Sequence, residues 1–110
     1  MIYLASPYSH PDPAVRQKRF EAVCQVAADL IRQGYVVFSP IAHSHVIAQH
    51  GLPTNWEFWE EQDRQFIAAC DQVWVLMIDG WEQSRGIHAE LTLAKQLGKP
   101  IRFLPGPKIE

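Results

Sequence analysis

Two carboxylates in the C-terminal half of the chain have the type and position to act on a substrate. Glu90 follows the segment Ser84–Gly86 and lies beside the apolar stripe of a predicted helix. Asp63 falls between Trp59 and Phe66 on the inward side of another predicted helix, where a charge is costly. Such carboxylates can act as a nucleophile, an acid or a base. Taken alone, Glu90 fits a solvated helix face better, but together with Asp63 it leads us to expect that both residues are catalytic.

The segment from Asp79 to Gly86 has the residues of an anion site. It joins a predicted strand to a predicted helix, so the free N–H groups and the positive dipole end of that helix would face a ligand. Ser84 adds a hydroxyl, Arg85 a charge, and Gly86 a backbone that a ligand can approach. Trp81 is a candidate for stacking on a base. The segment has neither a Walker A nor a GxGxxG motif, so an ordinary loop with a serine cap is the alternative.

More polar side chains follow the other predicted strands. Ser6 and Tyr8 follow the first strand, and His43 and His45 follow the second. We expect Ser6, Tyr8 and His43 to contact a substrate, whereas a solvated loop or helix is the alternative for the histidines. The spacing of His43, His45 and His50 lacks a metal-binding motif, and the cysteines are distant. We therefore expect no metal and no cofactor.

The elements that must position these residues alternate between strand and helix. Continuously apolar runs predict strands, and helical spacing predicts helices. The predicted strands are Met1–Ala5, Tyr35–Phe38, Gln72–Ile78 and Pro100–Leu104. The first predicted helix begins at Asp12-Pro13 and ends at Gly34, and the second covers Ile41–His50. The third begins at a Thr54/Glu57 capping box and runs to about Ala69, and the fourth covers Ser84–Leu97. A tail covers Pro105–Glu110.

This alternation predicts the fold class and the place of the site. Strands without polar alternation are typical of a parallel sheet that is buried on both faces. We predict an α/β, single-domain, Rossmann-like (flavodoxin-like) parallel sheet of four or five strands over residues 1–110, with helices on both faces. Ligands bind such sheets at the carboxyl ends of the strands. The segments Ser6–Asp12, Ser39–His45 and Asp79–Gly86 follow those ends.

Length and composition exclude several classes of protein. The 110 residues suffice for one core but not for two domains. A formal charge of −2 argues against a protein that coats nucleic acid, although a local phosphate pocket remains open. There is no membrane-length apolar run and no signal-peptide pattern, and Cys24 and Cys70 fit no CxxC motif. We expect a cytoplasmic protein that binds neither a nucleic acid polymer nor a membrane.

The order of residues in the C-terminal half resembles that of the nucleoside 2-deoxyribosyltransferase superfamily, which includes the 2′-deoxynucleoside 5′-phosphate N-hydrolases. The matching positions are Asp63, Asp71, Val73–Ile78, Ser84, Gly86, Glu90 and Gly98-Lys99-Pro100. The opening IYLASPYS is similar to the first strand and substrate loop of that family. The middle, about Ile41–Pro53, matches poorly, and Ser6-Pro7-Tyr8-Ser9 replaces the glycine- and arginine-rich first loop of the hydrolases.

The resemblance implies a reaction. By position, Glu90 corresponds to the nucleophile of the family and Asp63 to the carboxylate that handles the proton. The transferases commonly have Asp six residues before the nucleophile, and the phosphate-recognising hydrolases have Ser there, as this chain has Ser84. The resemblance thus implies an N-glycosidase or deoxyribosyltransferase that acts on a nucleoside or a nucleoside 5′-monophosphate.

Two other functions remain open. One is a catalytically inactive module of the same fold that binds a nucleotide or nucleotide-sugar, and the other is an interaction protein with an aromatic surface. Because the family often completes its site with a neighbouring chain, we also expect a homodimer or larger homo-oligomer.

The catalytic assignment makes a geometric prediction. Glu90 and Asp63 should lie in one pocket, with their carboxyl groups within roughly 10 Å of each other. Their mutual repulsion should raise the pKa of one group, which then holds a proton at neutral pH. That role suits Asp63 as the acid and leaves Glu90 as the nucleophile.

Overall fold

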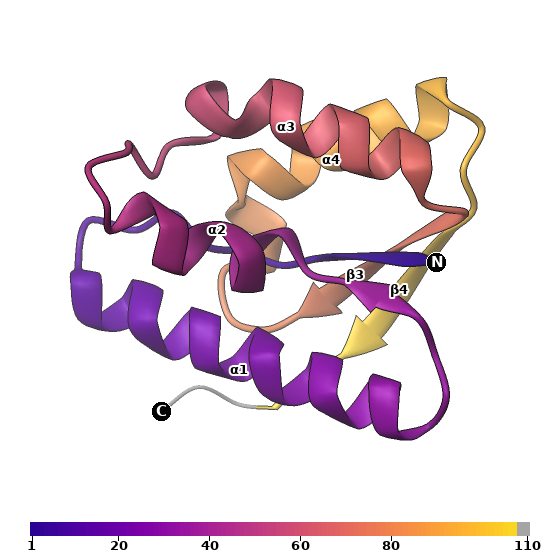
Figure 1. Ribbon diagram of the computed structural model, residues 1–110, viewed down its shortest axis with the longest axis horizontal. Coiled ribbons are helices and arrows are strands. Elements are labelled where there is room, and N and C mark those ends of the chain that lie inside the picture. The colour runs from indigo at the N-terminus through magenta and orange to yellow at the C-terminus, as the bar shows by residue number, and fades with distance from the viewer. Residues whose placement is uncertain (108–110) are drawn as a thin grey trace.

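The computed structural model describes residues 1–107, which form a four-stranded parallel sheet between layers of helices (Figure 1). The strands lie in the order β2-β1-β3-β4. They are β1 (Ile2–Ala5), β2 (Val37–Phe38), β3 (Gln72–Met77) and β4 (Ile101–Pro105). The helices are α1 (Pro13–Arg32), α2 (Pro40–Ala48), α3 (Trp56–Ala69) and α4 (Arg85–Gln96), and η1 (Trp81–Gln83) is a 3₁₀ turn. This arrangement confirms the predicted α/β, Rossmann-like fold class. The end of the predicted tail lies outside the described residues.

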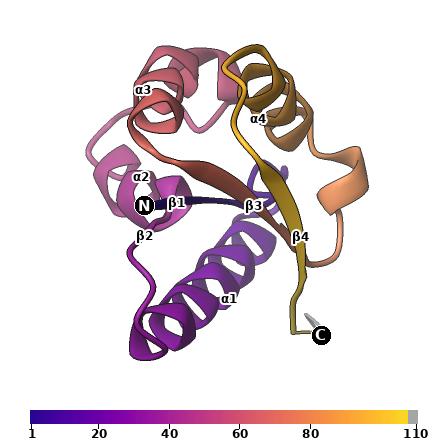
Figure 2. The same cartoon turned by 90° about the vertical axis from the view of Figure 1, so that its right-hand side faces the viewer.

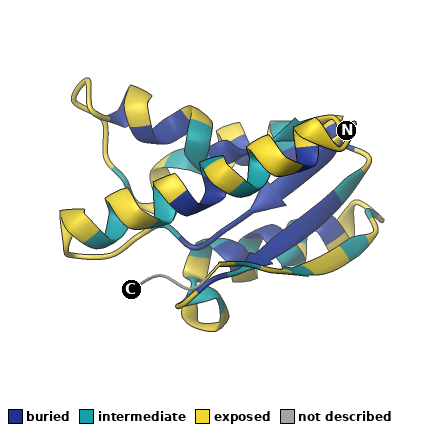
Figure 3. Cartoon of the chain, turned by 90° about the horizontal axis from the view of Figure 1, so that it is seen from below, coloured by how far each residue is buried: buried dark blue, intermediate teal, exposed yellow. Residues whose placement is uncertain are grey.

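The two central strands place their side chains alternately on the two faces of the sheet. Leu4 and Leu76 pack with Val23 of α1 on one face. Tyr3 and Val75 pack on the other face with side chains of α3 and α4. Figure 2 shows α1 on one side of the sheet and α3 and α4 on the other. Seen from below in Figure 3, the strands are mostly buried and the outer surfaces of the helices are exposed. Burial on both faces explains why the strand sequences lack alternation.

Polar side chains begin three of the helices. Asp12 accepts a hydrogen bond from the N–H of Ala14, with Pro13 in the first helical position, as predicted. Ser39 caps α2, and Ser84 caps α4. Because the strands are parallel and each helix follows a strand, these helix starts gather at the carboxyl edge of the sheet.

Two local predictions are wrong. The second strand has two residues rather than four: Gly34 turns the chain with φ 98°, and Val36, 67% exposed, contacts β1 only through its carbonyl oxygen, which accepts a hydrogen bond from the N–H of Ile2. The predicted capping box of Thr54 and Glu57 does not form. Helix α3 begins after Asn55 rather than after Thr54, without a side-chain cap, and Glu57 pairs with Arg85 of α4.

Candidate functional site

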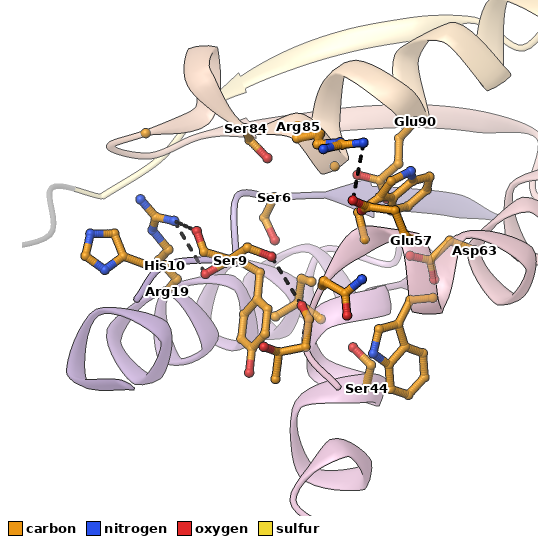
Figure 4. A pocket seen from close by; sticks show the side chains of 18 of the residues that line it. Ser6, Ser9, His10, Arg19, Ser44, Glu57, Asp63, Ser84, Arg85 and Glu90 are labelled. Atoms are coloured by element: carbon orange, nitrogen blue, oxygen red, sulfur yellow. Dashed lines mark hydrogen bonds and ion pairs between the residues drawn. The ribbon is translucent and has the colours of Figure 1, made fainter. Parts of the chain in front are cut away.

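A cavity of about 530 Å³ lies at the carboxyl edge of the sheet (Figure 4). Its walls come from the β1–α1 loop, α1, α2, the start of α3 and the segment from Gly80 to α4. The lining includes most of the residues predicted from the sequence: Ser6, Tyr8, Asp63, Ser84, Arg85, Gly86 and Glu90. Parallel strands bring their carboxyl ends together, and this explains how residues so far apart in the chain share one cavity.

The two carboxyl groups lie deep in this cavity. Glu90, in the second turn of α4, is 4% exposed, and Asp63, in the middle of α3, is 8% exposed. The hydroxyl of Tyr3, from β1 beneath both helices, donates a hydrogen bond to Oε2 of Glu90. Neither the spacing nor the resemblance indicated this partner for Glu90.

Burial shifts the protonation of both acids. It raises the pKa of Asp63 to about 7 and that of Glu90 to about 8. The hydrogen bond from Tyr3 lowers the pKa of Glu90, and the charge of Asp63 raises it. The nearby hydroxyl of Tyr3 also lowers the pKa of Asp63. Burial and the two neighbouring carboxylates also raise the pKa of Tyr3 itself, so its hydroxyl remains a donor. The sequence predicts one raised pKa, on Asp63, with Glu90 left ionised. The structure instead raises the pKa of both groups, and that of Glu90 further, because both are removed from water and the charge of Asp63 acts on Glu90.

Ser84 and Arg85, at the start of α4, lie beside Glu90 along the upper side of the cavity in Figure 4. The Oγ of Ser84 accepts a hydrogen bond of 3.2 Å from the N–H of Ile87, so its own hydrogen stays available. Nη2 of Arg85 lies 3.2 Å from Oε1 of Glu57, and this ion pair links the first turns of α3 and α4. Gly86 presents backbone to the cavity between these groups.

The sequence did not single out Arg19, which lines the same cavity. Its Nη1 donates a hydrogen bond of 3.0 Å to the carbonyl oxygen of Ser9. Its Nη2 donates a hydrogen bond of 3.4 Å to the carbonyl oxygen of Asp79. No carboxylate in residues 1–107 forms an ion pair with it. Gly80, with φ 93°, lets the guanidinium approach, because a Cβ there would lie 2.4 Å from Nη2. Burial lowers the pKa of Arg19, and the nearby charge of Asp79 opposes this shift.

Ser6 is the second unexplained polar group of the cavity. It follows β1 directly and is 4% exposed. Its Oγ has no hydrogen-bond partner, the one such buried side-chain atom in the described part of the chain. Because buried hydroxyls in native proteins nearly always have a partner, this atom is available to a ligand or to a bound water.

Two expected contacts lie elsewhere. His43 packs against Phe38 and Phe66, with ring centroids 5.7 and 5.6 Å apart, and it does not line the cavity. Trp81 lies in η1, which turns its ring onto Phe103 of β4 at 5.7 Å. The tryptophans that line the cavity are those in the first turn of α3, at positions Trp56 and Trp59.

The cysteines and Asp71 lie outside the centre of the cavity. Cys24 is half-buried and Cys70 buried, and both are free thiols. Asp71 pairs with the N-terminal ammonium group of Met1 rather than entering the cavity. Over residues 1–107, no cluster of His, Cys, Asp and Glu has the arrangement to hold a metal ion.

A parallel α/β sheet with a polar cavity and two buried carboxyl groups at its carboxyl edge defines a Rossmann-like domain with a candidate active site. The chain belongs to a family of domains of unknown function, DUF1937, whose family model matches residues 1–104. No curated protein matches the chain. Among the helices of residues 1–107, none has the length and apolar character to cross a membrane.

Proposed function

We propose that this chain cleaves or exchanges the N-glycosidic bond of a nucleoside 5′-monophosphate, or of a nucleoside, through a covalent intermediate on Glu90. One observation carries the proposal: Glu90 and Asp63, buried side chains from two different helices, line one cavity at the edge of the sheet where ligands bind. The roles agree with those that the resemblance to the nucleoside 2-deoxyribosyltransferases implies for the same two positions.

The proposed reaction has two steps, as in a retaining glycosidase. The carboxylate of Glu90 attacks the anomeric carbon, the bond to the base breaks, and the base takes a proton from Asp63. The ionised Asp63 then takes a proton from water, or from the N–H of a second base, and that nucleophile displaces Glu90 from the sugar. The hydrogen bond that Tyr3 donates favours the ionised form of Glu90, which the first step requires.

Three features favour a substrate with a 5′-phosphate. The N-terminus of α4, capped by Ser84, offers free N–H groups and a positive dipole end. Arg19 brings a guanidinium without a carboxylate partner in the described chain, and Ser6 brings its unpaired hydroxyl. The rings of Trp56 and Trp59 would pack against the base.

A reaction on nucleotides also fits a cytoplasmic protein, where thiols such as Cys24 stay reduced.

A panel of nucleosides and nucleoside 5′-monophosphates, in ribo and 2′-deoxy forms, tests the proposal. We expect chromatography to detect free base from a monophosphate, and a second base added to the reaction will separate transfer from hydrolysis. Binding of monophosphates in calorimetry without release of base from any compound would identify the chain as an inactive nucleotide- or nucleotide-sugar-binding module. Neither binding nor release would contradict the proposal.

Substituting alanine for Gly86 should impair the site and spare the fold. The added Cβ would meet Oγ of Ser84 and the ring of Trp56 at 3.8 Å, an ordinary contact distance. Alanine also favours the helix by about 1 kcal/mol over glycine. Yet the methyl group fills space in the cavity, so calorimetry should give monophosphate affinity about tenfold lower. Unchanged affinity in the folded variant would argue against a ligand at this backbone.

The proposal includes a homodimer or larger homo-oligomer. Helix α2 and the start of α3, which border the cavity, expose apolar side chains: Val46, Ile47 and Phe58. Exposed apolar groups on neighbouring elements favour association. Light scattering at micromolar concentration should therefore give at least twice the chain mass of 12.6 kDa. A mass of one chain would refute the expectation.

A further inference from the structure

A second cavity, of about 340 Å³, adjoins the first. Tyr8, Ala48 and Thr54 line both cavities, so the two spaces share a wall. The remaining lining residues of the second cavity are Pro13, Arg16, Gln17, His45 and Gln49. Because the same three residues border both spaces, a ligand that lies against Tyr8 in the first cavity is next to the second.

The chemistry of the second cavity differs from that of the first. The first is lined by three carboxylates, those of Glu57, Asp63 and Glu90, whereas the lining of the second contains none. Arg16 is half-buried there and donates to the backbone carbonyl groups of His10 and Pro11. It forms no ion pair with a carboxylate in the described part of the chain. The second cavity therefore holds a positive charge that the protein does not neutralise at contact distance.

The hydrogen bonds of His45 leave Arg16 as the charged group of this cavity. Nε2 of His45 lies 3.1 Å from Oε1 of Gln17, and its Nδ1 lies 2.6 Å from the hydroxyl of Tyr8. Nε2 also lies 3.5 Å from Nε2 of Gln49, but the contact with Gln17 is the shorter one. The oxygen of Gln17 can only accept, so Nε2 carries the hydrogen and Nδ1 accepts from Tyr8. This is the neutral form of the ring, and burial lowers the pKa of His45 in agreement with it.

We propose that the second cavity is a subsite for a second phosphate group, so that the preferred ligand of this chain is a nucleotide with a phosphate beyond the one at α4. A guanidinium binds a phosphate through paired hydrogen bonds, and the amide groups of Gln17 and Gln49 can add donors. A nucleoside 5′-monophosphate bound at α4 leaves Arg16 without a charged partner. This inference rests on the proposed function for the first phosphate and the sugar, and it names a narrower class of substrate.

Calorimetry with matched ligands tests the subsite. Three ligands place the second phosphate differently: a 2′-deoxynucleoside 3′,5′-bisphosphate, the 5′-diphosphate and a 5′-phosphorylated dinucleotide, each with the base that binds best as a monophosphate. We expect at least one to bind the wild-type protein about tenfold more tightly than the monophosphate. Arg16→Gln should reduce that ratio to about one. Arg32→Gln removes a cation from the exposed end of the same helix and should keep the ratio.

The outcomes separate this inference from the proposed function. If the monophosphate binds but all three ratios are near one, or if Arg16→Gln leaves a high ratio unchanged, the second subsite is refuted and the proposed function stands. If no nucleotide binds, the proposed function fails, and inorganic pyrophosphate then tests the subsite alone. NMR signals of the His45 ring should shift saturably with pyrophosphate in the wild type and not in Arg16→Gln. No saturable shift in the wild type would overturn the subsite.

Discussion

Replacing Glu90 by glutamine is expected to abolish the release of base and to spare the binding of nucleotide. The amide keeps the shape of the carboxylate but cannot attack the anomeric carbon, so turnover should fall about 10³-fold or more. Chromatography of the free base measures the first effect, and calorimetry measures the second. Glu61→Gln is the matched control, because Glu61 lies on the exposed side of α3 and pairs with Arg64. Substantial turnover by Glu90→Gln would eliminate Glu90 as the nucleophile.

Thermal unfolding of Glu90→Gln tests whether a loss of turnover comes from misfolding. Burial raises the pKa of Glu90 from its ordinary value of 4.5 to about 8, so the folded chain binds more protons than the unfolded chain between these values. The free energy of unfolding of the wild type should therefore fall as the pH rises through that range. Glutamine has no proton to lose. We expect Glu90→Gln to unfold at a higher temperature than the wild type at pH 9, by an amount that shrinks towards pH 5.

The order of the elements could be predicted because each main strand is buried on both faces. Val73 and Val75 face α3 and α4, while Trp74 and Leu76 face α1, so the run in β3 shows no polar position. The two-residue strand β2 could not be predicted in the same way. Tyr35 and Val36 are as apolar as their neighbours, but the turn at Gly34 determines where the chain joins the sheet.

The carboxylates of the candidate site could be predicted because each is an exception on an otherwise apolar helix face. The roles of the tryptophans could not. Trp81 and Trp56 lie in similar polar segments, but the left-handed turn at Gly80 carries Trp81 towards β4, and the first turn of α3 points Trp56 at Gly86. Such directions depend on neighbours that the local sequence does not contain.

Arg19 was missed for a related reason. The contacts that hold it are backbone carbonyl groups of two separate loops, at Ser9 and Asp79, and any residue type offers a carbonyl. No pattern of side chains therefore marks an arginine as part of a cavity wall. The unpaired hydroxyl of Ser6 is likewise visible only once its surroundings are known.

Tyr3→Phe is expected to shift the pH dependence of activity. Phenylalanine fills the same buried space but removes the hydroxyl that donates to Glu90. That hydrogen bond lowers the pKa of Glu90, so the pKa of Glu90 should rise without it. Because Glu90 must be ionised to attack, the acid limb of kcat/KM should move to higher pH. A hydrogen bond to a charged group contributes about 1.5–3 kcal/mol, so activity at pH 7 should fall about 10- to 100-fold.

The shape of the profile distinguishes this electrostatic role from packing. Where Glu90 is ionised in both proteins, at the alkaline end, the difference between wild type and Tyr3→Phe should shrink. The matched control is Tyr35→Phe, because Tyr35 packs on Trp74, with ring centroids 5.2 Å apart, and does not line the cavity. Its profile should overlay that of the wild type. An equal loss at every pH in Tyr3→Phe, with the acid limb in place, would mean that the hydroxyl supports the packing of the site and does not set the ionisation of the two acids.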